Sequence, residues 1–132
     1  MLVIRLSRLV YRRATEELLG MRLKQFIALT HLSNTPGVSQ KQLGEALHLD
    51  PNNTVLMLND LEAAGWAERR RDPEDRRRHT VELTAGGRKA LARAERALDS
   101  LEGEVLEALS PDERATLREL LVRAVADVPA PV

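Results

Sequence analysis

The sequence contains no cysteine, and this absence excludes disulfide bonds and a thiol-based redox sensor. It contains one phenylalanine, one tyrosine and one tryptophan, so a ligand pocket lined mainly by aromatic side chains is not expected. No apolar run is long enough to span a membrane, and arginines interrupt the apolar residues of positions 1–13, which argues against a secretory signal. We therefore expect a cytoplasmic protein without a membrane partner.

The residue patterns of common catalytic and cofactor sites are also missing. His31, His48 and His79 are far apart in the sequence, and no paired spacing connects them, so a metal site is not expected. The sequence has no glycine-rich phosphate loop, no nucleophile elbow and no pair of catalytic carboxylates. These absences favour a protein that is not an enzyme and that uses no cofactor.

The charge of the chain is balanced overall but unevenly distributed. The formal net charge is zero, yet residues 66–89 contain eight basic residues against five acidic ones, whereas residues 95–127 contain nine acidic residues against four arginines. The first segment is suited to an anionic partner such as nucleic acid. The alternative is that these side chains form an ordinary solvated surface.

At 132 residues the chain has the length of one domain, and apolar residues at helical spacing dominate it. A first amphipathic helix is expected to begin at Leu2 and to end near Gly20. A second helix is expected to end at residues 34–37, which disfavour helical structure. Its buried face is predicted to consist of Leu23, Phe26, Ile27 and Thr30.

The next two helices have clear start signals. Residues 39–42 form a capping box, in which the serine hydroxyl accepts from the third helical N–H and the second glutamine reaches back. Asp50 and Pro51 are favoured at the start of the following helix, and Gly65 is suited to its left-handed end. Two short helices joined at residues 48–49 predict a helix-turn-helix. The buried face of the second helix is expected to consist of Thr54, Met57, Leu58 and Leu61.

Residues 66–87 predict a basic β-hairpin. An arginine-rich strand leads to a turn at residues 72–75, a second arginine cluster follows, and Val81 and Leu83 then alternate with polar residues as in a half-buried strand. Thr84 is suited to start a long helix. On its own the hairpin could be a solvated surface feature. Beside a helix-turn-helix it predicts a winged-helix fold, mainly α with a small β-wing.

Residue types on the hairpin and on the helix before it are suited to DNA. An arginine at the hairpin tip can enter the minor groove, and Asp75 is expected to orient Arg77 for this contact. The exposed helix face carries asparagines that can pair with adenine and Leu56, which can contact a thymine methyl. The alternative for Leu56 is packing against a neighbouring element. Because that helix contains no Arg or Lys, phosphate affinity is expected mainly from the hairpin and Lys41.

The first helix and the two C-terminal helices carry more apolar surface than one small winged-helix core can cover. We expect these helices to associate into a two-fold dimer, which would match a palindromic DNA site. The alternative is that they pack against one another within one subunit. Residues 128–132, with two prolines, are expected to be frayed. The apolar seams are Leu2, Leu6, Leu9 and Val10, then Leu91, Ala94, Leu98, Leu101 and Val105, and finally Leu117, Leu120, Leu121 and Ala124.

The chain resembles the MarR family of bacterial winged-helix transcription regulators over nearly its whole length. The strongest motifs are L-x-x-A-L-x-L-D from residue 43, L-x-x-L-E-A-A-G from residue 58, E-R-R-R-D-P-E-D-R-R-R from residue 68 and L-T-x-x-G from residue 83. The resemblance implies a DNA-binding region at about residues 23–87 and dimerisation helices at about residues 1–20 and 88–127. It also implies that DNA is released when a small, frequently aromatic ligand binds between the dimer helices and the DNA-binding region.

We therefore expect a homodimeric transcription regulator, a repressor released by a small-molecule effector, that binds a palindromic double-stranded DNA site. The alternative is a dimeric winged-helix module that binds a protein partner through its acidic long helix. The resemblance places base contacts at the start of the recognition helix and a minor-groove contact at the hairpin tip. The predicted DNA-binding residues are Gln40, Lys41, Asn52, Asn53, Thr54, Leu56, Arg69, Arg70, Asp75, Arg76, Arg77 and Arg78.

Overall fold

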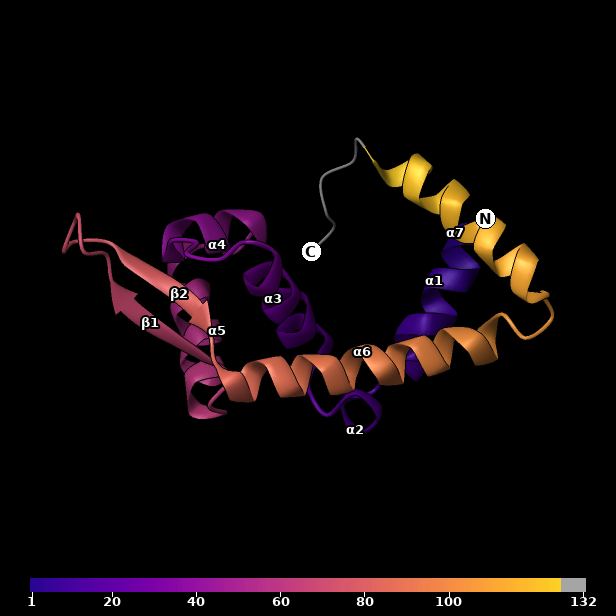
Figure 1. Ribbon diagram of the computed structural model, residues 1–132, viewed down its shortest axis with the longest axis horizontal. Helices are drawn as coiled ribbons and strands as arrows, with labels where there is room; N and C mark the ends of the chain where they lie inside the picture. Colours follow the sequence, from indigo (N-terminus) through magenta and orange to yellow (C-terminus); the bar gives the residue numbers. More distant parts are fainter. Residues whose placement is uncertain (127–132) are drawn as a thin grey trace.

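The computed structural model describes residues 1–126, which form helices and one two-stranded antiparallel sheet (Figure 1). The segment expected to be frayed, residues 128–132, lies outside this range. No helix among the described residues is long and apolar enough to cross a membrane. The elements are α1 (Leu2–Arg13), α2 (Glu16–Leu19), α3 (Leu23–Asn34), α4 (Gln40–Ala46), α5 (Pro51–Ala63), β1 (Ala67–Arg71), β2 (His79–Leu83), α6 (Ala85–Val105) and α7 (Pro111–Val125).

The elements are arranged along α6. Figure 1 shows the sheet, α4 and α5 at one end of this long helix and α1 and α7 at the other. The core lies among α3, α4, α5 and the sheet, and α6 packs against it through α3 and β2. The fully buried side chains of the core include Leu29, Leu43, Leu58, Leu61 and Val81. The predicted fold class, mainly α with a small β-wing, is confirmed.

The prediction of one continuous first helix that ends near Gly20 is wrong. The chain leaves the helical conformation at Ala14, and the Thr15 hydroxyl then accepts a hydrogen bond from the Leu18 N–H at 3.2 Å. This bond caps α2 as a separate helix, because a threonine side chain satisfies an N–H that has no partner within the helix. Gly20, with φ 77°, ends α2 rather than α1.

The buried face of α3 also differs from the predicted one. The expected residues Leu23, Phe26, Ile27 and Thr30 are only half buried. The buried residues are Gln25, Ala28, Leu29 and Leu32, which repeat with the same helical spacing on a neighbouring stripe. The cause is tertiary, because α3 contacts α4, α6 and β2 at once and is therefore covered over more than one stripe.

The helix-turn-helix forms as predicted. The Ser39 hydroxyl accepts from the Gln42 N–H at 3.1 Å, and the Gln42 side-chain oxygen accepts from the Ser39 N–H at 3.1 Å. Asp50 caps α5 by accepting from the Asn53 N–H at 2.7 Å. The two helices approach so closely that a Cβ atom on Gly44 would lie 2.4 Å from the Thr54 hydroxyl oxygen. This close contact fixes α5 relative to α4.

The wing is the antiparallel pair β1–β2, in which Arg69 lies opposite Val81. The connection spans residues 72–78, so the turn is longer than the predicted 72–75 and the second arginine cluster lies in it rather than on a strand. Two backbone bonds of 3.0 Å close this loop, from the Asp72 N–H to the Arg78 carbonyl and from the Arg78 N–H to the Asp75 carbonyl. The root of the wing is joined to the start of α4, because the Val81 N–H donates to the Val38 carbonyl at 2.9 Å.

Only part of the predicted C-terminal seam is covered within the chain. Leu91, Ala94 and Leu101 on α6 are buried against the rest of the chain. By contrast, no residue of α1 or α7 is buried. Packing of these terminal helices within one subunit therefore leaves their apolar residues in contact with solvent.

The carboxyl group of Glu102 on α6 provides a prediction about pH. Partial burial raises the pKa of Glu102 above its ordinary value of 4.5, and the nearby charge of Asp99 adds to this, whereas Arg118 opposes it. Because the folded chain holds this proton more tightly than the unfolded chain, Glu102 lowers stability as the pH rises from about 4.5 through its folded pKa. In thermal melts, we expect the difference in melting temperature between Glu102→Gln and the unmodified protein to increase in favour of the variant as the pH rises through that range. Parallel curves for the two proteins would contradict this expectation.

Candidate nucleic-acid interface

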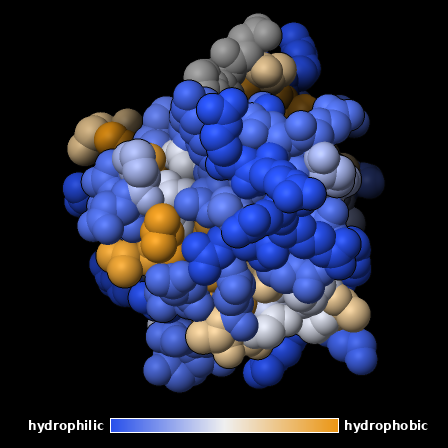
Figure 2. Space-filling model, turned by 90° about the vertical axis from the view of Figure 1, so that its left-hand side faces the viewer, coloured by the Kyte–Doolittle hydropathy of each residue, from blue (hydrophilic) through white to orange (hydrophobic). Residues whose placement is uncertain are grey.

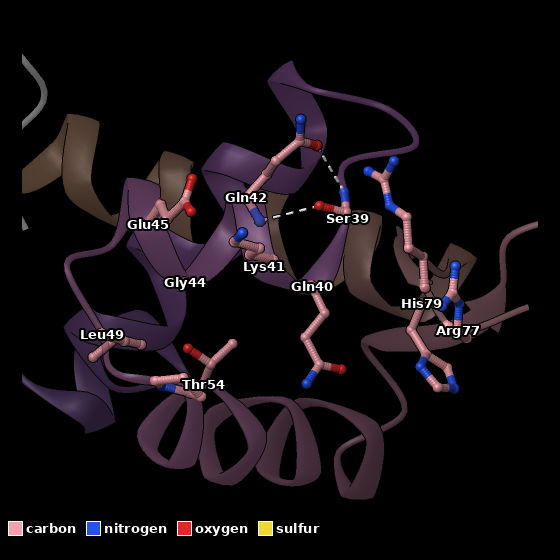
Figure 3. A pocket seen from close by; sticks show the side chains of 12 residues that line it. Ser39, Gln40, Lys41, Gln42, Gly44, Glu45, Leu49, Thr54, Arg77 and His79 are labelled. Atoms are coloured by element: carbon pink, nitrogen blue, oxygen red, sulfur yellow. Dashed lines mark hydrogen bonds between the residues drawn. The ribbon is translucent and has the colours of Figure 1, made fainter. Parts of the chain in front are cut away.

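A cavity of about 1000 Å³ lies between the start of α4, the start of α5 and the loop of the wing. Figure 3 shows Gln40 extending from α4 toward α5, with Arg77 and His79 of the wing to its right and Lys41 to its left. The capping box that starts α4 and the Asp50 cap that starts α5 thus also position the polar side chains at one edge of this cavity, which we call the groove. The groove is lined by Ser39, Gln40, Lys41, Gln42, Gly44, Glu45, Leu49, Pro51, Thr54, Arg77, Arg78 and His79.

The groove brings together five of the predicted DNA-binding residues from three elements of the fold, namely Gln40, Lys41, Thr54, Arg77 and Arg78. Cationic side chains dominate its charge, since Lys41, Arg77 and Arg78 face a single acidic residue, Glu45, in the lining. The face of the molecule that carries the wing is mostly hydrophilic (Figure 2). An open, cation-rich groove on a mostly hydrophilic face is suited to an anionic chain.

Sequence reasoning did not assign seven of the twelve groove residues to the site, and two of these seven, Glu45 and His79, have ionisable side chains. His79 is the first residue of β2 and directly follows the arginine cluster, so its position at the end of a basic run was a usable signal. Glu45 lies one helical turn after Lys41 on α4, which places both residues on one face. Neither residue belongs to a motif, and their shared location depends on the tertiary arrangement of α4 and the wing.

The wing tip carries Asp75 and Arg77, but the contact of Asp75 with the Arg77 guanidinium is weaker than the predicted fixed pairing. The Arg77 side chain is 93% exposed, and its Nε atom lies 3.5 Å from the nearer carboxylate oxygen of Asp75. The same oxygen accepts from the Arg77 backbone N–H at 3.0 Å, so Asp75 holds the loop backbone more firmly than it holds the guanidinium. Within residues 1–126, Arg76 and Arg78 form no ion pair with a carboxylate. The tip therefore presents three arginines to solvent.

The two predicted arginines on β1 are placed differently. The Arg69 guanidinium is bonded to Glu62 and also donates to the Asn59 side-chain oxygen at 2.8 Å. Arg70 is paired with Glu68 and lies 3.4 Å from a carboxylate oxygen of Glu82. The hydrogen bond to Glu68 and the charges of both carboxylates raise the pKa of Arg70. These two arginines are compensated within the chain, unlike those of the wing tip.

Fewer polar side-chain groups of α5 are free to contact a partner than its sequence suggests. Asn52 and Leu56 are exposed, Leu56 by 53%. The Asn53 amide nitrogen donates to the Asp50 carboxylate at 2.9 Å, so one of its donors is already used in the helix cap. Thr54 is only 3% exposed, and its hydroxyl donates to the Asp50 carbonyl at 2.8 Å. The geometry gives Thr54 a role in packing α5 against α4, at the floor of the groove.

Comparison with known proteins finds one family and many related chains. Residues 19–78 match the sequence profile of the MarR family. A putative transcriptional regulatory protein for the hcr operon of Thauera aromatica is 39% identical over 92 residues, which cover 70% of this chain and 55% of that protein. The transcriptional regulator HosA of Escherichia coli O111:H- is 34% identical over 109 residues, which cover 83% of this chain and 81% of HosA. The chain thus spans about half of the first relative and most of the second.

Solved structures of MarR from E. coli have the same fold. A MarR mutant superposes with a TM-score of 0.80 and 27% identity, covering 94% of this chain and 93% of that one. The same mutant complexed with operator DNA superposes with a TM-score of 0.71 and 28% identity, covering 94% of this chain and 91% of that one. On the profile match, the identity to HosA and the shared winged-helix fold, the chain belongs to the MarR family of transcription regulators.

Proposed function

We propose that the protein is a homodimeric transcription regulator that binds a specific site in double-stranded DNA. The observation that carries this proposal is the groove between α4 and the wing, which gathers Lys41, Arg77 and Arg78 around one open space. The operator complex of the related MarR mutant supports DNA as the anionic partner. Filter-binding titrations against genomic fragments at two salt concentrations test the proposal, because a protein-binding module would retain no fragment at either concentration.

In the proposed complex, α5 lies in the major groove and the wing tip reaches the neighbouring minor groove. Asn52 and Leu56 are the open side chains for base edges, and Asn53 retains its oxygen and one donor hydrogen for a further contact. Arg77, with Arg76 and Arg78 beside it, supplies charge at the wing tip. Gln40 and Lys41 at the start of α4 hold the sugar-phosphate backbone. Thr54 acts in this proposal by positioning α5.

The second part of the proposal is dimerisation through the terminal helices. Exposed apolar side chains are concentrated there, on α1 at Leu2, Val3, Ile4, Leu9 and Tyr11 and on α7 at Leu120, Leu121, Val122 and Val125. Large contiguous apolar surfaces of this kind mark interfaces in soluble proteins. A two-fold dimer would bury both helices and place two recognition helices about one duplex turn, ~34–36 Å, apart.

Repression released by a small-molecule effector is the regulatory output that we propose. A second cavity, of about 390 Å³, lies between α6 and the junction of α1 and α2, which is the side of the molecule assigned to dimerisation. It combines the apolar side chains of Leu18 and Leu101 with the ion pair of Arg13 and Glu104. A compound that releases DNA by binding there should protect α2 and α6 from hydrogen exchange. Protection confined to the wing would contradict this location.

The wing tip gives a direct prediction for DNA binding. Replacing Arg77 with alanine is expected to weaken binding and to reduce the slope of log Kd against log salt concentration by about one unit, because one phosphate contact fewer releases about one counterion fewer. Fluorescence anisotropy titrations at several potassium chloride concentrations measure both effects. Arg96→Ala, which removes an exposed arginine in the middle of α6, is the matched control. Unchanged affinity and slope for Arg77→Ala would remove the wing tip from the mechanism.

A further inference from the structure

Arg69 connects the wing to the recognition helix. Its guanidinium, carried by β1, bonds to the Glu62 carboxylate and donates to the Asn59 side-chain oxygen at 2.8 Å, and both partners lie on the last turns of α5. The Arg69 side chain is only 26% exposed, compared with 93% for Arg77 at the wing tip. One planar cation thus spans the two elements that the proposed function assigns to the major and minor grooves.

This geometry is unlike that of a phosphate contact. The guanidinium already uses two of its five N–H donors inside the protein, and its charge is balanced by Glu62. Moving it to DNA would leave the Glu62 carboxylate, itself partly covered, without its partner. The binding free energy that Arg69 could gain from a phosphate is therefore opposed by the loss of the contacts to α5.

The same bond restricts what Asn59 can offer to DNA. The side-chain oxygen of Asn59 is an acceptor for Arg69, so its amide group is oriented with the two N–H donors away from that bond. A side chain held in this way keeps both N–H donors but only one free lone pair, in a fixed orientation, for the donor-and-acceptor pairing with adenine. Arg69 therefore affects both the angle of the wing and the hydrogen-bonding character of Asn59.

The other flank of α5 is tied in a similar manner. Arg22, the residue before α3, donates to the carboxylate of Asp60 at 2.8 Å, next to Asn59 in the sequence. This pair is more exposed than the pair of Arg69 and Glu62. Since surface ion pairs contribute little to stability, the more enclosed contact of Arg69, which bonds to two residues of α5, is the one expected to set the position of the wing.

We propose that Arg69 is a positioning residue for sequence-specific binding, which acts by locking the wing to α5 through Glu62 and Asn59 and not by contacting phosphate. This inference rests on the proposed DNA-binding function. It separates two groups of arginines in the wing. Those of the tip contribute charge and raise affinity for any sequence, whereas Arg69 contributes orientation and raises affinity only for the specific site.

The test compares Arg69→Gln with the unmodified protein on two duplexes, one carrying a site recovered from a random pool and one of the same length with that site scrambled. We expect Arg69→Gln to lose about tenfold in affinity for the specific duplex. Its affinity for the scrambled duplex and its salt slope on either duplex should remain unchanged. Glu62→Gln should produce the same pattern, and the exchanged pair Glu62→Arg with Arg69→Glu should recover part of the lost specificity. Melting temperatures verify that each variant is folded.

Arg71→Gln is the matched control, because it removes the same charge from the same strand at a residue without an ion pair among residues 1–126. Its ratio of specific to non-specific affinity should equal that of the unmodified protein. Two results would overturn the inference: an equal loss on both duplexes with a slope reduced by about one unit, which indicates a phosphate contact, or an unchanged affinity ratio in Arg69→Gln. If the unmodified protein itself fails to discriminate between the duplexes, the proposed function fails instead.

Discussion

Leu121→Glu is expected to convert the protein from a dimer to a monomer and to abolish tight DNA binding. Leu121 is 43% exposed on α7, in the apolar seam that we assign to the dimer interface. A two-fold interface would bury two copies of the new carboxylate, and each unpaired buried charge costs several kcal/mol. We therefore expect the dimer dissociation constant to rise by at least about 1000-fold, which corresponds to about 4 kcal/mol. Sedimentation velocity over a concentration series measures it.

The matched control for this variant is Thr116→Glu. Thr116 is exposed on the same helix, and at 100° per residue it lies on the side opposite Leu121, Val122 and Val125. It introduces the same charge and should leave the dimer intact. A monomeric Thr116→Glu would indicate general damage to α7, and a fully dimeric Leu121→Glu would show that α7 is not the interface.

Gly87→Ala is expected to destabilise the folded chain by about 3 kcal/mol or more, since severe overpacking of a buried site exceeds the usual range of such substitutions. A Cβ atom at this position would lie 2.0 Å from the backbone carbonyl oxygen of Trp66 and 2.8 Å from a methyl carbon of Leu83. The contact with the Trp66 carbonyl cannot be relieved without moving the backbone at the junction of the wing and α6. Thermal melts should show a decrease in melting temperature of about 10 °C or more.

Gly103→Ala provides the control in the same helix. A Cβ atom on Gly103 would have only the Arg114 side chain as a neighbour, at 3.9 Å, which is an ordinary contact distance. Because alanine has the higher helix propensity, this substitution should stabilise the protein by about 0.5–1 kcal/mol. A similar loss of stability in both variants would contradict the steric explanation for Gly87.

The starts of the helices could be predicted from the sequence because helix capping is local. The box at Ser39 and the caps at Asp50 and Thr84 involve partners within three residues, and all three form as expected. The L-T-x-x-G motif combines a local cap with a tertiary contact. Thr84 caps α6 by accepting from the Gly87 N–H at 3.0 Å and also donates to the Gly65 carbonyl at 2.6 Å. Gly87 itself packs so closely against the Trp66 carbonyl that a side chain would not fit there.

Features that depend on distant elements could not be predicted in this way. The apolar spacing of α3 fits two adjacent stripes, and only the positions of α4, α6 and β2 determine which one is buried. The pairing of Arg69 with Glu62 and Asn59 joins residues seven and ten positions apart across a helix end and a turn. The sequence indicated a basic hairpin there but not which arginines are compensated. The helix break at Thr15 was not predicted because the apolar spacing was given more weight than the preference of threonine for capping a helix.

The central claim is that two identical winged-helix units bind a two-fold symmetric DNA site. Selection of bound duplexes from a random pool, followed by sequencing, tests it most directly. We expect the recovered duplexes to share an inverted repeat whose half-sites are centred about one helical turn, roughly 10 base pairs, apart. Failure to enrich any sequence at low salt, or enrichment of a single asymmetric half-site, would contradict the account.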